Sequence, residues 1–237
     1  MTKLVNSATI HSLFSVILVL ASPSWAQTPA PVGEQIAKAY GLDGFGQIEA
    51  IRYTFNAQVL GNNVARSWVW WPKTGQISYK GKDKDGKPVK VTYVESQLDA
   101  ASANVKDAIE PAFANDKYNM IFPLQSYWDG AALHDKGMQK LPLGEGSARL
   151  VVVDYSPGDV WDLYLAPDYR VEAFVFHRGD SGLKPTLAVA TWGAYKKTGP
   201  LLISTDRRGT ADGQPLRVWF TDLAVKLAGS DEWINAQ

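Results

Sequence analysis

The residues of this chain that could perform acid–base, nucleophilic or metal chemistry do not form a motif. His134 and His177 stand alone, without the H-x-H or H-E-x-x-H spacing of zinc sites. In the segment 178–182, Arg-Gly-Asp-Ser-Gly, the second glycine comes one residue after Ser181 and not two, so the segment misses the G-x-S-x-G pattern of serine hydrolases. The chain also lacks a glycine-rich phosphate loop. We therefore predict no metal ion, no cofactor and no enzymatic activity.

The acidic residues likewise do not form a metal-binding or catalytic motif. The segment 83–87 with Glu95 faintly resembles a calcium loop, but its alternate lysines would repel the cation, and a hairpin tip explains it better. Asp159, Asp162 and Asp168 are candidates for a carboxylate pair that cleaves glycosides. Asp159 and Asp168 are expected in turns, however, so we do not predict a catalytic pair.

Composition narrows the classes of partner. The chain has no cysteine, which removes disulfides and thiol chemistry, and its 24 basic residues balance 24 acidic ones. Nucleic acids and anionic membranes attract a basic surplus, so neither is expected as the main partner. Aromatic residues are the real excess, with nine tryptophans, ten tyrosines and eight phenylalanines.

The N-terminus has the features of a signal peptide. An apolar run over 13–21 is too short to span a bilayer, and Pro23 and then Ser24-Trp25-Ala26 follow it as a helix breaker and a cleavage site. We predict a signal peptide over 1–26, a tether over 27–31 and a single domain over 32–237. The mature protein is then expected to be exported to the periplasm, without a lipid anchor on cysteine.

The stretch 66–79, Arg-Ser-Trp-Val-Trp-Trp-Pro-Lys-Thr-Gly-Gln-Ile-Ser-Tyr, carries three tryptophans within four residues. In a strand, Trp68 and Trp70 share one face, whereas Trp71 lies on the other. Large rings on both faces need apolar cover on both sides, or a ligand on one. After a proline and a turn, Ile77 and Tyr79 resume the alternation, so the stretch predicts a hairpin.

A wider aromatic set accompanies this hairpin and gives the candidate ligand-binding residues. An apolar patch that a soluble protein exposes usually marks a binding site. We therefore expect an aromatic-lined cavity, and an aromatic-rich core without a ligand remains the alternative. The candidate ligand-binding residues are Tyr53, Phe55, Trp68, Trp70, Trp71 and Tyr79.

The order of elements predicts a mainly β protein. A short helix over 32–40 precedes an alternating strand over 51–58 and the tryptophan hairpin. A helical insertion over 96–128, broken at Pro123, is the natural lid of the sheet. Further strands are expected at intervals of roughly ten residues, which suggests a sandwich or barrel. These later strands cover 150–154, 161–165, 171–176, 186–192 and 216–227.

This layout resembles the periplasmic lipoprotein-carrier superfamily, the LolA/LolB-like fold. The local likeness lies in the segments 53–57, 66–72, 75–79 and 85–87. The resemblance implies a curved antiparallel sheet, an incomplete barrel, with an N-terminal helix and the helical insertion as a lid. It also implies a cavity for acyl chains and an arginine that holds the lid closed. Arg52 and Arg66 are candidates for that arginine by strand position.

Three classes of function remain open. The first is a periplasmic, non-enzymatic binding or carrier protein for a lipid or other apolar ligand, with envelope lipoproteins as candidate partners in outer membrane biogenesis. The alternative is an extracytoplasmic carbohydrate-binding or envelope-assembly module, in which Trp68, Trp70 and Trp71 stack on sugar rings. An enzyme would need converging polar groups that the sequence does not show.

Overall fold

The structure is a computed structural model that describes residues 31–83, 86–155, 158–179, 183 and 185–237. Within these residues, 13 strands form one antiparallel sheet. The strands are β1 (Ile48–Val59), β2 (Asn62–Trp71), β3 (Gln76–Lys82), β4 (Pro88–Val94), β5 (Ala132–Lys140), β6 (Ser147–Tyr155), β7 (Asp159–Leu165), β8 (Val171–His177), β9 (Leu187–Thr191), β10 (Gly193–Thr198), β11 (Leu201–Ala211), β12 (Gln214–Leu227) and β13 (Trp233–Asn235).

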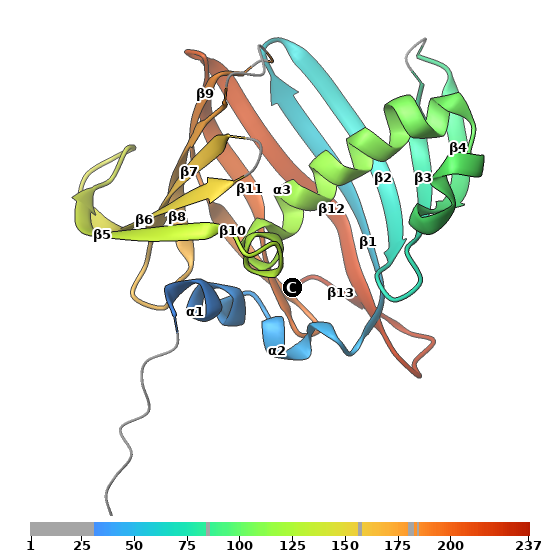
Figure 1. The fold of residues 1–237 in the computed structure, drawn as a ribbon, viewed down its shortest axis with the longest axis horizontal. Coiled ribbons are helices and arrows are strands. Elements are labelled where there is room, and N and C mark those ends of the chain that lie inside the picture. Colours follow the sequence, from blue (N-terminus) through green and yellow to red (C-terminus); the bar gives the residue numbers. More distant parts are fainter. Residues whose placement is uncertain (1–30, 84–85, 156–157, 180–182, 184) are drawn as a thin grey trace, which may run out of the picture.

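The sheet curves strongly but does not close. Its order is β4-β3-β2-β1-β12-β11-β9-β8-β7-β6-β5, and β10 and β13 pair with β11 and β12 outside this path. In the described residues the two end strands, β4 and β5, do not pair with each other. The curved sheet therefore has a concave face, and the long helix α3 (Glu110–Trp128) crosses it (Figure 1). The predicted fold class, an incomplete antiparallel barrel with a helical lid, is confirmed.

The remaining helices are short. Helix α1 (Val32–Ala39) and helix α2 (Leu42–Phe45) lie at one end of the sheet, ahead of β1 (Figure 1). A 3₁₀ helix, η1 (Glu95–Ala100), and a π-helical turn, η2 (Val105–Ile109), lead into α3. The predicted helical insertion over 96–128 thus corresponds to η1, η2 and α3.

Helix α3 is kinked, as the proline within it predicts. Pro123 lies inside the helix, and Ile121 just before it has non-helical dihedral angles, φ −118° and ψ 27°. Pro123 does not end the helix as a break would, because α3 continues to Trp128.

The alternation of side chains in β1 and β2 places most of their large aromatic rings on the concave face of the sheet. Tyr53 and Phe55 point to the concave face, and their cross-strand partners on β2 are Trp68 and Arg66. Trp68 and Trp70 are buried there, each against the ring of Phe113 on the α3 helix. The helical insertion therefore covers the face that these two tryptophans share.

Four of the strands were not predicted from the sequence. The pattern predicted strands at the positions of β6, β7, β8, β9 and β12, but β5, β10, β11 and β13 were not anticipated. Most of the side chains of β5 are exposed, so this strand lacks the alternation by which a half-buried strand is found. A bulge within β5, between Asp135 and Met138, further interrupts its register.

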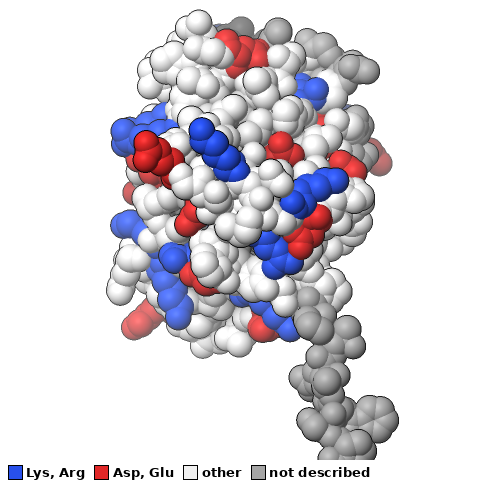
Figure 2. Space-filling view, turned by 90° about the vertical axis from the view of Figure 1, so that its left-hand side faces the viewer, with Lys and Arg blue, Asp and Glu red and all other residues white. Residues whose placement is uncertain are grey.

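The predicted signal peptide over 1–26 and most of the tether over 27–31 lie outside the described residues. In the part of the chain that is described, no helix has the length and apolar character to cross a membrane. Figure 2 shows one side of the molecule, on which basic and acidic side chains are interspersed. No field of a single sign dominates that side.

Candidate functional site

A cavity of about 630 Å³ lies between α3 and the concave face of the sheet. Its volume falls within the range of roughly 300–1,000 Å³ that is typical of small-molecule sites. Most of its wall is apolar and comes from both halves of the sheet. The apolar and aromatic lining residues are Phe55, Ala57, Val59, Val64, Ala114, Tyr118, Tyr155, Trp161, Phe174, Phe176, Pro185, Ala188, Leu216 and Val218.

The aromatic part of this wall is one connected cluster. The ring centroid of Trp161 on β7 lies 4.7 Å from the ring centroid of Phe176 and 5.1 Å from that of Phe174, both on β8. From α3, Phe122 approaches the indole to 4.6 Å and Tyr118 to 5.7 Å. The ring faces of this cluster are apolar, which suits a wall that packs against hydrocarbon, although the Tyr118 hydroxyl and the Trp161 indole N–H are buried without hydrogen-bond partners among the described residues.

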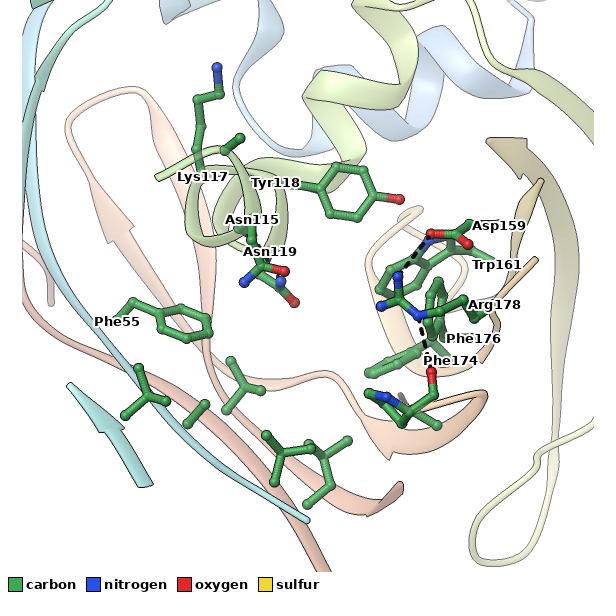
Figure 3. A pocket seen from close by; sticks show the side chains of 18 of the residues that line it. Phe55, Asn115, Lys117, Tyr118, Asn119, Asp159, Trp161, Phe174, Phe176 and Arg178 are labelled. Carbon is green, nitrogen blue, oxygen red and sulfur yellow. Dashed lines mark hydrogen bonds and ion pairs between the residues drawn. The ribbon is translucent and has the colours of Figure 1, made fainter. Parts of the chain in front are cut away.

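Polar groups gather at particular places around the cavity rather than lining it evenly. Asn115 and Asn119 reach into it from α3, whereas Lys117 points away (Figure 3). At the opposite side, Arg178 lies 3.9 Å from the Asp159 carboxylate and donates from Nε to the main-chain oxygen of Pro185, 3.1 Å away. The charges at this rim are thus already paired.

A buried carboxylate fastens α3 to the sheet. Asp116 is fully buried and accepts hydrogen bonds from Arg66 Nε at 2.7 Å and Arg66 Nη2 at 2.5 Å. The indole nitrogen of Trp68, also on β2, donates to the same carboxylate at 2.9 Å, and the Asn115 amide donates at 3.1 Å. This bidentate pair and its extra donors form a charge-assisted latch between helix and strand. We call Arg66 and Asp116 the latch.

Burial raises the pKa of Asp116 above its usual 3.8, although the hydrogen bonds and charge of Arg66 and the donors of Trp68 and Asn115 oppose this shift. Desolvation of the charged form is the larger effect. The ionised latch therefore carries a desolvation cost, which its four hydrogen bonds offset only in part.

A second contact holds α3 at its kink. Pro123 has no N–H, so the carbonyl of Asn119, four residues earlier, lacks its usual helical donor. Nη2 of Arg207 on β11 donates to that oxygen at 2.6 Å. The arginine thus replaces the hydrogen bond that the proline removes, and it joins the middle of α3 to the centre of the sheet.

The burial of Arg207 is unusual for a charged side chain. It is 1 % exposed, and its guanidinium carbon lies 3.5 Å from the centroid of the Trp192 ring and 5.7 Å from that of Phe220. Burial lowers the pKa of Arg207 to about 9, which leaves it charged at neutral pH. Its Nε and Nη1 have no hydrogen-bond partner among the described residues.

The six predicted ligand-binding residues separate into three groups. Phe55 lines the cavity. Tyr53, Trp68, Trp70 and Tyr79 are buried in the hydrophobic core and are not among the lining residues. Trp71 is half-buried and belongs to the opposite face of β2. The structure therefore brings one of the six to the cavity, and four of the others form the packed layer beside it.

Sequence reasoning missed the residues that define the lid. Asp116 precedes Lys117, Arg207 lies between Asp206 and Arg208, and neither belongs to a motif. A proline inside a predicted helix was the available signal for Arg207, since it implies an orphaned carbonyl four residues earlier. Trp161, Phe174 and Phe176 lie in strands that the sequence predicts, over 161–165 and 171–176, but they were not predicted to line a cavity.

The residues considered for catalysis are dispersed. His134 pairs with Asp154 at 3.0 Å and His177 with Asp162 at 3.3 Å, both near the surface. Asp168 pairs with its neighbour Arg170 in a turn. Among the described residues, no three His, Cys, Asp or Glu side chains are grouped as a metal site would require.

The segment considered as a calcium loop forms the tip of the β3–β4 hairpin, as predicted. Asp83 accepts from the backbone N–H of Gly86 and of Lys87, which closes the turn. Residues 84–85 within it, and residues 180–182 of the rejected hydrolase motif, lie outside the described residues.

Taken together, the fold and the cavity define a curved-sheet protein with a latched helix over an apolar cavity. No family model matches the chain, and no curated protein is similar enough to match. Among solved structures, a DUF1329 family protein from Desulfovibrio piger ATCC 29098 aligns with 85% of this chain and 95% of its own. The two share 10% sequence identity with a TM-score of 0.44.

Proposed function

We propose that this protein is a non-enzymatic periplasmic carrier that binds an acyl chain or another apolar ligand beneath α3. The observation that carries the proposal is the cavity of about 630 Å³ with an aromatic and aliphatic wall. Each Å² of apolar ligand surface that the wall removes from water contributes about 25 cal/mol. Hydrocarbon is the chemistry that such a wall recognises, because the cavity offers few polar groups without partners.

The latch supports a lid function for α3. An arginine that holds a closed lid is what the resemblance to lipoprotein carriers implies, and the ion pair of Arg66 with Asp116 on α3 supports giving that role to Arg66. The other candidate, Arg52, donates to Asn235 at 3.0 Å and is not part of the contact with α3. In the proposal, ligand binding and release involve movement of α3 about this latch.

Carbohydrate binding by a tryptophan platform is not favoured. Trp68 and Trp70 are 1% and 7% exposed beneath α3, and Trp71 belongs to the opposite face of the strand. The three rings therefore do not share an exposed surface on which a sugar could stack. This geometry removes the main argument for the carbohydrate-binding module.

Titration of delipidated protein with a fluorescent fatty acid tests the proposal. We expect saturable binding at one site, with displacement by unlabelled acyl chains. Native mass spectrometry of the exported protein, purified without delipidation, should show a co-purifying mass in the lipid range. Absence of saturable binding for every acyl ligand tried would contradict the proposal, and a co-purifying glycan would replace it.

A further inference from the structure

Arg207 is a buried cation that the fold itself does not neutralise. Its single hydrogen bond to a neutral carbonyl, at 2.6 Å, leaves Nε and Nη1 without partners among the described residues. Removing a guanidinium from water without a counter-charge is costly, and buried polar groups are nearly always paired. An unpaired buried arginine therefore needs a partner that the polypeptide does not supply.

The other cations around the cavity already have carboxylate partners. Arg66 pairs with Asp116 at 2.5 Å, Lys117 with Glu95 at 3.6 Å, and Arg178 with Asp159 at 3.9 Å. In the described part of the chain, Arg207 has no such pair, and the aromatic ring of Trp192 lies directly against its guanidinium. An anion in this region would find its free donors on Arg207.

Arg207 lies immediately behind the cavity wall. The residue that accepts its hydrogen bond, Asn119, lines the cavity, and the Asn119 side chain reaches into it (Figure 3). Its cross-strand partner Val218 also lines the cavity. The Trp192 ring below it contacts the lining residue Phe174, with centroids 5.4 Å apart.

We propose that the ligand is an anionic amphiphile whose carboxylate or phosphate head group displaces part of the wall beside Asn119 and binds Arg207, which is buried behind that wall and is not a lining residue, with its hydrocarbon chain along the aromatic wall. This inference rests on the proposed function and names its ligand class. A carboxylate or phosphate accepts two parallel hydrogen bonds from a guanidinium, so it matches the unpaired Nε and Nη1. Trp192 and Phe220 then exclude water from the ion pair.

The test compares three ligands with the same sixteen-carbon chain: hexadecanoate, hexadecyl phosphate and hexadecan-1-ol. Binding to the delipidated wild-type protein is measured by displacement of a fluorescent acyl probe. Charge-assisted hydrogen bonds predict that one or both anions bind roughly 10- to 100-fold more tightly than the alcohol. Which anion is preferred distinguishes a carboxylate from a phosphate head group.

Two variants locate the effect. Arg207→Met should reduce the preference for the anion to about 1-fold while binding of the alcohol is kept, because the apolar wall is unchanged. Arg208→Met, which removes the neighbouring and exposed arginine of β11 that pairs with Asp206 and does not line the cavity, is the matched control and should retain the preference. A preference that survives Arg207→Met, or that disappears in Arg208→Met, would overturn the assignment of the head group to Arg207.

A measurement on the wild-type protein guards against failure of the Arg207→Met variant to fold. The ¹⁵Nε–¹H resonance of Arg207 should shift when hexadecanoate binds, because the carboxylate accepts a hydrogen bond from Nε, and should shift far less with hexadecan-1-ol. Equal shifts of this resonance with the two ligands would overturn the inference. Equal binding of all three ligands would overturn it but leave the proposed function standing, whereas binding of none would remove both.

Discussion

Arg66 on β2 and Asp116 on α3 form a bidentate ion pair, with Nε to Oδ2 at 2.7 Å, that joins the sheet to the helix covering it. The two residues are fifty positions apart in the sequence. The carboxylate is fully buried and the arginine side chain is 22% exposed. This asymmetry means that the two halves of the latch should respond differently to substitution.

Arg66→Met should destabilise the protein more than Asp116→Asn. The first leaves a buried carboxylate without its counter-charge, which typically costs about 3–5 kcal/mol, whereas the second leaves an arginine that water can reach. Urea unfolding measures both free energies, and hydrogen exchange reports loss of protection in the first half of α3. Arg52→Met, which removes an arginine of β1 that does not contact α3, is the control. Equal loss of protection in the Arg52 and Arg66 variants would contradict the latch.

The latch also predicts a pH dependence. Because burial raises the pKa of Asp116, the folded protein binds more protons than the unfolded chain between pH 3.8 and the raised value. The free energy of unfolding contributed by this group is therefore fully present below pH 3.8 and declines as pH rises through the folded pKa. The stability of the wild type relative to Asp116→Asn should fall over this window in urea unfolding at a series of pH values. A difference that grows with pH would show that the carboxylate pKa is lowered instead.

Arg207 and Pro123 should be energetically coupled. Pro123→Ala restores an N–H that can donate to the Asn119 carbonyl, so Arg207→Met should cost about 1–2 kcal/mol less in that background than in the wild type. A double-mutant cycle measured by urea unfolding gives this coupling energy. The pair of Pro123→Ala with Arg66→Met should add within about 0.5 kcal/mol, since Arg66 does not contact that carbonyl. If the effects of Arg207→Met and Pro123→Ala were additive, Arg207 would not replace the hydrogen bond to the Asn119 carbonyl that Pro123 removes.

Trp161 should report ligand binding. It is the tryptophan that lines the cavity in the described part of the chain, and it packs against Phe174 and Phe176. Trp161→Phe should therefore lose most of the change in tryptophan emission that an acyl ligand produces. Trp219→Phe should keep it, because the Trp219 ring lies against Arg217 and is not among the lining residues. An unchanged response in Trp161→Phe would place the ligand elsewhere.

Much of the fold was accessible from sequence because its signals are local. Strict alternation identifies β1, and the polar tip around Gly86 identifies the hairpin between β3 and β4. Strand β5 has no fully buried position and contains a bulge, so its sequence lacks the alternation that would predict a strand. The sheet order, which places β1 beside β12, follows from long-range packing that local patterns do not encode.

The site was harder to predict than the fold. Aromatic residues mark both a core and a cavity, and the sequence does not distinguish the buried Trp68 from the cavity-lining Phe55. Whether a ring packs against α3 or faces the cavity depends on where the helix crosses the sheet. The ion pair of Arg66 with Asp116 and the contact of Arg207 with Asn119 join elements that are distant in sequence, so no spacing rule reveals them.

The central claim is that an apolar ligand occupies the cavity beneath α3, and a pair of identical substitutions tests it most directly. Ala57 on β1 lines the cavity, whereas Ala65 on the adjoining strand is exposed. The measurement is the dissociation constant of a fluorescent fatty acid for the delipidated Ala57→Trp and Ala65→Trp variants. We predict that filling the cavity in Ala57→Trp weakens binding at least about 10-fold, equivalent to about 1.4 kcal/mol, while Ala65→Trp binds like the wild type. Unchanged binding by a folded Ala57→Trp variant would contradict the account.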